Sequence, residues 1–309
     1  MKRRNFIAGL AGVTLASAVS SFAAEPSQVA VTMDDPHTAE TPRMSAQERN
    51  RAILDALGKH SNLKAALFVC GKRVDNEPGK RLLGEWNDRQ HIIANHSYSH
   101  PYFHSKRISV EEFIEDIRRG EAVIKDFSRF RKLFRFPFLK EGDTIEKRDR
   151  LRAYLRERGY RNGHVTIDAS DWYIDDRLRE RLKKEPDADT APYRDFYLKH
   201  IWDRATFYNS LVQKVSGYSV KHTLLIHHNL LNAMFLGDLL GMFKSRGWKL
   251  IDAENAFQDK FFSKSPAILP AGESLVWALA KQTGKFEGLL RYPAEDSRYE
   301  KAEMDRLGL

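Results

Sequence analysis

Cysteine is almost absent from this sequence of 309 residues, in which Cys70 is the only one. A single thiol excludes an intrachain disulfide scaffold and any cysteine-based structural zinc site within one chain. The sequence also has no internal repeat, no coiled-coil pattern and no glycine-rich loop of the kind that binds phosphate groups. Disulfide-rich mini-proteins and repeat arrays are therefore excluded.

Long hydrophobic runs are also missing. The apolar stretch Phe6–Val19 has about 14 residues, whereas a transmembrane helix needs about 20. It follows Lys2, Arg3 and Arg4, and small residues come after it, with Ser21-Phe22-Ala23 as the candidate cleavage site. This pattern predicts a signal peptide and an exported protein, periplasmic or extracellular, with no stable membrane insertion once the signal is removed.

The signal peptide is expected to cover residues 1–23, and two export routes stay open. Arg3-Arg4-Asn5-Phe6-Ile7 resembles a twin-arginine signal, but ordinary secretory signals also begin with basic residues. Without the three N-terminal cations, the net charge falls from +9 to +6. We interpret this modest excess as a solvated surface, and it requires no nucleic-acid partner.

The sequence does contain enough apolar material for a large core, since 42% of its residues are hydrophobic and 11% are aromatic. From Val29 onward, short aliphatic or β-branched runs alternate with longer amphipathic segments, a pattern typical of βα units around a parallel sheet or barrel. Seven runs are expected to form strands: Val29–Met33, Ala65–Val69, Ile92–Asn95, Leu133–Phe136, Val165–Asp168, Thr223–His227 and Trp248–Ile251. Seven strands suggest a closed or nearly closed barrel.

Two capping boxes predict where helices begin. In Ser45-x-x-Glu48 and Ser109-x-x-Glu112, serine and glutamate have the spacing that satisfies free backbone N–H groups at a helix N-terminus. Helices are therefore expected to follow both serines. Further helices are expected at Lys80–Arg89, Lys147–Glu157 and Asn232–Arg246.

Two regions depart from the βα alternation. Asp175–Thr190 is highly charged and precedes an expected helix, in which the following residues approximate one face: Tyr197, Ile201, Tyr208, Leu211, Val212 and Val215. That spacing favours core packing over a sugar-stacking platform. Ala253–Leu309 has weak periodicity and is expected to be a short capping segment with a mobile tail.

Histidine and aspartate supply candidate metal ligands. His96 and His100 are four residues apart, which on a helical turn places both rings on one face. Alone this is a weak signal. Asp34 and Asp35 are adjacent at the end of the first expected strand, where two carboxylates repel each other and a nearby cation would explain both. A helix cap or a turn explains the two aspartates equally well.

A metal held by histidine and aspartate with open coordination positions lets water lose a proton at about neutral pH, which indicates hydrolysis. Two other strand ends carry groups that such a reaction needs. Arg135 could keep a carboxylate base ionised, and His227 could protonate a leaving amine if a carboxylate such as Asp171 holds its ring. Taken singly, a surface ion pair and a packed histidine are the better explanations. All of these groups together, in this order along the chain, are much less expected by chance than any one of them.

These motifs, in this order, resemble those of the NodB-type polysaccharide deacetylases, carbohydrate esterase family 4. All five family motifs can be placed between Thr32 and His227, and the neighbouring stretches 66–69 and 91–96 also match. The resemblance implies an α/β fold, a distorted (β/α)7 barrel with a C-terminal extension. It also implies metal-dependent removal of acetyl groups, usually from N-acetylated sugars.

The resemblance implies roles for the residues of the first three motifs. Asp34 looks like the catalytic base, and Arg135 looks like the residue that orients it. Asp35, His96 and His100 look like the ligands of one divalent metal ion. Zinc is the leading candidate, and cobalt, nickel or manganese also suit such ligands.

The resemblance implies roles in the later motifs as well. The backbone N–H of Phe138 would help to stabilise the oxyanion, and Trp172 would line the pocket beside the acetyl methyl group. Asp171 would tune His227, the general acid. The segment between Trp172 and His227 is longer than in compact members of the family. This insertion is expected to affect which substrate is bound more than the chemistry of the reaction.

The barrel is expected to cover residues 24–252, with an insertion at about 173–221, and the C-terminal extension residues 253–309. The expected substrate is an N-acetylated glycan, either peptidoglycan or a chitin-like oligosaccharide. Alternatively, the same barrel could hydrolyse O-acetyl esters of xylan or a cyclic amide. A non-catalytic glycan-binding protein is a third alternative, against which the complete set of base, ligands and acid argues.

Two further histidines compete for these roles. His104 extends the series begun by His96 and His100, but Pro101 disfavours a helical turn leading into it, so His104 is not expected to bind the metal. His228 is adjacent to His227. Successive side chains of a strand point to opposite faces, and the family pattern selects His227 for the barrel interior.

Overall fold

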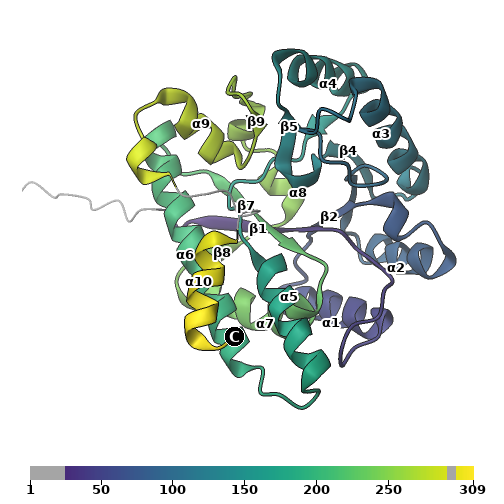
Figure 1. The fold of residues 1–309 in the computed structure, drawn as a ribbon, viewed down its shortest axis with the longest axis vertical. Coiled ribbons are helices and arrows are strands. Elements are labelled where there is room, and N and C mark those ends of the chain that lie inside the picture. Colours follow the sequence, from purple (N-terminus) through teal and green to yellow (C-terminus); the bar gives the residue numbers. More distant parts are fainter. Residues whose placement is uncertain (1–24, 291–296) are drawn as a thin grey trace, which may run out of the picture.

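The computed structural model describes residues 25–290 and 297–309. The expected signal peptide, residues 1–23, lies outside them. A curled, mainly parallel β-sheet forms the centre of the molecule, and helices pack around it (Figure 1). The α/β fold expected from the sequence is confirmed.

The strands of the main sheet lie in the order β6-β4-β3-β2-β1-β7, with β8 paired to the start of β1. Their bounds are β1 Gln28–Asp34, β2 Ala66–Val69, β3 Ile92–Asn95, β4 Phe130–Phe134, β6 Arg161–Asn162, β7 Lys221–His227 and β8 Lys249–Leu250. Two short strands, β5 (Lys140–Gly142) and β9 (Ala271–Gly272), form a separate antiparallel pair. Because all pairs of the main sheet are parallel, the C-terminal ends of its strands gather at one rim.

The predicted strand Val165–Asp168 is not formed as a regular strand. Only an isolated parallel bridge joins Ile167 to Leu224 of β7. The hydroxyl of Thr166 accepts the N–H of Thr223 at 2.8 Å, so side-chain hydrogen bonds replace part of the usual ladder. Since β6 pairs with β4 and Ile167 bridges to β7, this stretch connects the two edges of the sheet and gives a distorted barrel.

Both predicted capping boxes are confirmed. The serine hydroxyls at positions 45 and 109 accept the backbone N–H of the glutamate three residues later, and each glutamate accepts the N–H of its serine. The helices that follow are α1 (Ala46–Lys59) and α3 (Val110–Ile124). The remaining helices up to β8 are α2 Glu77–Asp88, α4 Ile145–Glu157, α5 Asp171–Lys184, α6 Ala191–Ser216 and α7 Leu230–Ser245.

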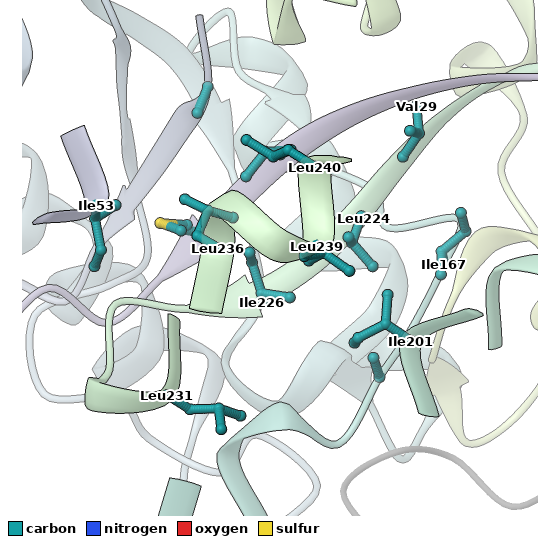
Figure 2. Close-up of a cluster of buried hydrophobic side chains, with 14 of the residues drawn as sticks. Val29, Ile53, Ile167, Ile201, Leu224, Ile226, Leu231, Leu236, Leu239 and Leu240 are labelled. Atoms are coloured by element: carbon teal, nitrogen blue, oxygen red, sulfur yellow. The ribbon is translucent and has the colours of Figure 1, made fainter. Parts of the chain in front are cut away.

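The largest core cluster lies between the sheet and helices α6 and α7 (Figure 2). In Figure 2, leucines of α7 surround the strand residues Leu224 and Ile226, and Ile201 of α6 lies near Ile167. Tyr197 and Tyr208 of α6 are also fully buried. The prediction that the aromatic residues of this helix form core is therefore confirmed for both.

The C-terminal extension is packed, which differs from the predicted mobile tail. Its described helices are α8 (Ala253–Ala256), α9 (Leu275–Thr283) and α10 (Arg298–Leu307). Phe261, Leu275 and Met304 are buried in the main core cluster. The periodicity is weak because this segment consists of short elements that each contribute a few core residues. Within the described ranges, no helix combines the length and the apolar character needed to cross a membrane.

Candidate active site and metal centre

The residues singled out from the sequence meet at the C-terminal rim of the sheet. Asp34 ends β1, His227 ends β7, and His96 directly follows β3. They face an open pocket of about 920 Å³. The predicted site residues that line this pocket are Asp34, Asp35, His96, His100, Phe138, Trp172 and His227. Arg135 and Asp171 are fully buried and do not line the pocket. Arg135 contacts Asp34, and Asp171 contacts His227.

Asp35, His96 and His100 form a compact group of metal-ligating atoms. One ligand atom from each lies within 4.8 Å of the other two. Burial lowers the pKa of both histidines to about 4, so their rings are neutral at neutral pH. His96 donates its Nδ1–H to the carbonyl oxygen of Arg135 at 2.8 Å, which leaves the lone pair of Nε2 available.

The surroundings of these atoms also fit a bound cation. The Nε2 atom of His96 lies 3.5 Å from Oδ2 of Asp34, and the Nε2 atom of His100 lies 3.6 Å from Oδ2 of Asp35. Oδ1 of Asp35 is buried and has no hydrogen-bond partner among the described residues. Arg135 and Arg73 each contact one oxygen of these aspartates, but neither arginine contacts the buried Oδ1 of Asp35. The donor set therefore suits a divalent ion with open coordination positions.

The turn that carries the two candidate histidine ligands is not helical, contrary to the prediction. Ser97 and His100 have left-handed backbone angles, with φ of 66° and 60°. Asp116 of α3 holds the turn: its carboxylate accepts the backbone N–H groups of Tyr98 and Ser99 and the hydroxyl of Ser99. The four-residue spacing thus brings both rings to one side through a braced, irregular turn.

Asp34 and Arg135 form a buried ion pair beside this group. NH1 of Arg135 donates to Oδ1 of Asp34 at 2.6 Å, and both side chains are almost fully buried. Arg135 also lies over the Phe68 ring and donates its Nε–H to the carbonyl oxygen of Gly163. Burial raises the pKa of Asp34, while the charge of Arg135 opposes that rise. Asp34 is thus a carboxylate held in one orientation with its basicity increased by its surroundings.

Asp171 holds His227, which is the strand partner of Asp34 at the end of β7. Its Oδ1 accepts Nδ1–H of His227 at 2.8 Å. Its Oδ2 accepts the backbone N–H of His227 and the side-chain amides of Asn229 and Asn232. Burial alone would lower the pKa of His227, but the charge of Asp171 and its hydrogen bond raise it to about 9. His227 is therefore a protonated imidazole at neutral pH that can donate from Nε2.

Phe138 and Trp172 complete the pocket wall. Phe138 has left-handed backbone angles, φ 56° and ψ 15°, and its side chain is 41% exposed. Its ring lies edge-on to that of His100, with 4.5 Å between centroids. A strained backbone that keeps an aromatic ring in solvent beside candidate ligands is typical of a functional site.

Two contributors to the site were missed by the sequence analysis. An NH2 atom of Arg73 lies 3.3 Å from Oδ2 of Asp35, and Asp116 braces the histidine turn. Neither is the last residue of a strand, as Asp34 and His227 are, so no positional signal marks them. Both reach the site only because the fold brings distant segments together.

His104 lies outside the metal-ligating group. Its Nε2–H donates to the carbonyl oxygen of Ala271 at 2.9 Å, on the side of the β5–β9 pair. We expect His104→Ala to keep metal content and turnover close to normal, because no candidate ligand loses a partner. Metal content after dialysis and acetate release under saturating substrate check this. Loss of the metal would show that His104 is a ligand after all.

Comparisons with known proteins find similarity to polysaccharide deacetylases over part of this chain. Residues 23–163 match the family model for polysaccharide deacetylase. The peptidoglycan-N-acetylglucosamine deacetylase of Bacillus cereus is 28% identical over 149 residues, which are 47% of this chain and 46% of that protein. The peptidoglycan-N-acetylglucosamine deacetylase PgdA of Listeria monocytogenes is 32% identical over 114 residues, 36% of this chain. The aligned part is less than half of the first relative and only 21% of the second.

Solved structures share the fold. A mutant of the peptidoglycan deacetylase PdaC from Bacillus subtilis matches with a TM-score of 0.50 at 22% identity, over 75% of this chain and 91% of that one. BA3943 from Bacillus anthracis, described as a CE4 family pseudoenzyme, matches with a TM-score of 0.51 at 17% identity, over 75% of this chain and 65% of that one. The predicted NodB-type barrel is confirmed by this likeness. In sequence, residues 23–163 are similar to the polysaccharide deacetylases, and the fold is similar to that of solved deacetylases.

Proposed function

We propose that the protein is an exported, metal-dependent hydrolase that removes acetyl groups from an N-acetylated glycan, with peptidoglycan as the leading substrate and a chitin-like oligosaccharide as the next. The observation that carries this proposal is that the pairs Asp34–Arg135 and His227–Asp171 lie at the same pocket as the Asp35, His96 and His100 group. A base, an acid and a cation site thus face one pocket. This is the set of groups that amide hydrolysis needs.

In the proposed reaction, Asp34 takes a proton from the attacking water while the water oxygen bonds to the carbonyl carbon. The backbone N–H of Phe138 donates to the carbonyl oxygen as that oxygen gains negative charge. The C–N bond then breaks, and His227 gives its Nε2 proton to the departing amine nitrogen. The products are acetate and a free amino group on the sugar.

A divalent ion at Asp35, His96 and His100 would polarise the acetyl carbonyl and make the attacking water more acidic. Zinc is the leading candidate because two imidazoles and a carboxylate suit it, and cobalt, nickel or manganese would also fit.

The test is acetate release from peptidoglycan fragments, chito-oligosaccharides and acetylxylan in parallel, with and without a chelator. Chelator-sensitive release from the N-acetylated substrates supports the proposal, and mass spectrometry of cell-wall fragments would locate the free amine. Acetate from acetylxylan alone would support the O-acetyl esterase alternative. Glycan binding without acetate release would support the non-catalytic alternative.

Asp171→Asn is expected to move the alkaline limb of the pH–kcat profile to lower pH. The acid must be protonated, so activity is present below the pKa of His227 and is lost as pH rises through it. Removing the negative charge of Asp171 lowers that pKa by about 1–3 units, from its value of about 9. Asp203→Asn, an exposed carboxylate of α6, is the control. An alkaline limb that does not move in Asp171→Asn would contradict the pairing of acid and carboxylate.

A further inference from the structure

Helix α6, which lies in the predicted insertion at about 173–221, presents three buried polar side chains on one face. Tyr197, His200 and Arg204 are spaced three and four residues apart, so they point in about the same direction. Their exposed fractions are 0%, 7% and 1%. Buried polar groups need hydrogen-bond partners, and these three find theirs at the candidate active site.

His200 and Arg204 hold the loop that leads into α5. Nε–H of Arg204 donates to the carbonyl oxygen of Asp168 at 2.9 Å. Nε2 of His200 accepts the backbone N–H of Ser170 at 3.0 Å. The next two residues along the chain are Asp171, which holds the proposed acid, and Trp172, which lines the pocket. Two side chains of α6 therefore fix the backbone immediately before these residues.

Tyr197 contacts the side-chain amide of Asn232, which in turn contacts the carboxylate of Asp171. Its hydroxyl donates to Oδ1 of Asn232, and Nδ2 of Asn232 donates to Oδ2 of Asp171 at 2.8 Å. Oδ1 of Asp171 accepts Nδ1–H of His227. Tyr197, Asn232 and Asp171 are all completely buried. A hydrogen-bond chain of four side chains thus runs from α6 to the proposed acid.

Nδ2 of Asn232 also lies within hydrogen-bond distance of the carbonyl oxygen of His227, at 2.9 Å, and of Oδ1 of Asn229, at 3.0 Å, while the tyrosine hydroxyl is the donor at Oδ1. Without a donor at Oδ1, the buried amide oxygen would lose its partner, and the amide that donates to Asp171 would be held less firmly. Because the site is dry, such an unpaired group costs more than it would in water. Tyr197 therefore keeps a donor on Asp171 and, through Asp171, keeps His227 in place.

We propose that α6 is a positioning element of the deacetylase site, in which Tyr197 orients Asp171 and His227 through Asn232, while His200 and Arg204 fix the loop before Asp171. The expected change in kcat rests on the proposed function. The expected position of Asp171 and His227 does not depend on activity. The C-terminal extension contributes as well. Oε1 of Glu300 in α10 lies 3.5 Å from Nδ1 of His200, and Figure 1 shows α10 beside α6.

The test is Tyr197→Phe, which removes one hydroxyl and keeps the ring. Tyr193→Phe, one turn earlier on α6 and also buried, is the matched control because Tyr193 lies outside the chain of hydrogen bonds. In Tyr197→Phe we expect kcat per folded protein to fall about tenfold, the equivalent of one hydrogen bond, with KM close to that of the control and a lower Tm, because Oδ1 of Asn232 loses its donor. We also expect the downfield proton resonance of His227 Nδ1–H to shift or broaden in the metal-free protein.

A second pair of variants keeps the inference testable if Tyr197→Phe folds poorly. His200→Ala removes the acceptor for the Ser170 N–H, whereas His200→Gln retains one. We expect kcat to fall in the first variant and to recover at least partly in the second. The inference is overturned if Tyr197→Phe matches Tyr193→Phe in both kcat and the His227 resonance, or if His200→Gln is no better than His200→Ala. If the wild-type protein releases no acetate, the proposed function fails, and the His227 resonance alone still decides the positioning role.

Discussion

Asp34→Asn is expected to lower acetate release by about 10²–10⁴-fold while the protein keeps its metal. Asparagine can still accept the hydrogen bond of Arg135, but it cannot take a proton from water. Asp34 lies outside the compact group formed by Asp35, His96 and His100, so no metal ligand is lost. Arg135 is buried and loses its counter-ion, so Tm should also fall, and turnover is normalised to folded protein.

A variant of a candidate metal ligand provides the comparison for this prediction. His96→Ala removes one of three ligand atoms and should leave the protein largely metal-free after dialysis. Metal per chain is measured by elemental mass spectrometry, together with acetate release, on both variants. A metal-free Asp34→Asn protein, or a fully loaded His96→Ala protein, would show that base and ligand have been assigned the wrong way round.

Signals that depend on a few neighbouring residues predicted the structure best. The strand Ile92–Asn95 has the predicted bounds, and the two serine–glutamate capping boxes begin α1 and α3 as expected. Asp34 and His227 were predicted at strand ends, and parallel pairing brings both to one rim. In each case, the residues that specify the feature lie within a few positions of it.

Predictions that depended on distant contacts were less accurate. The turn from His96 to His100 was expected to be helical, but its left-handed backbone is held by Asp116, which comes from α3. The stretch from Val165 to Asp168 was expected to be a strand, but its hydrogen bonds to Thr223 include side chains. Local periodicity contains no information about such partners.

The predicted insertion also makes contacts at the candidate site that local sequence patterns do not reveal. Tyr197 was correctly predicted to be buried, because helical spacing of aromatic residues indicates a core face. Its hydroxyl, however, bonds to Asn232, 35 positions away. The sequence favoured an effect of the insertion on the substrate, whereas the contacts of α6 connect it to Asp171. From the sequence alone, a tyrosine that only packs in the core cannot be distinguished from one whose hydroxyl is hydrogen-bonded to a distant residue.

His227 and His228 differ in what surrounds them although they are adjacent. Both border the pocket, but the side chain of His227 is 22% exposed and bonds to Asp171, whereas His228 is 1% exposed. The ring of His228 is buried, lies 3.1 Å from the side-chain oxygen of Asn50 and contacts Trp86. Burial holds the pKa of His228 well below its ordinary value, so this ring stays neutral. Only His227 therefore has both the charge and the access of a general acid.

His227→Ala is accordingly expected to lose about 10²–10⁴-fold in kcat with KM little changed, since a general acid acts on the transition state more than on binding. His228→Ala should keep most of its kcat, but it leaves a cavity beside Trp86 and loses about 2–4 kcal/mol of unfolding free energy. Steady-state kinetics and urea unfolding on the two variants separate these effects. Because the acid is needed only when the amine departs, a more activated acetyl ester with a good leaving group should be hydrolysed by His227→Ala almost as well as by the wild type. A large kcat loss confined to His228→Ala, or an equal loss on amide and activated ester, would show that His227 does not supply the proton.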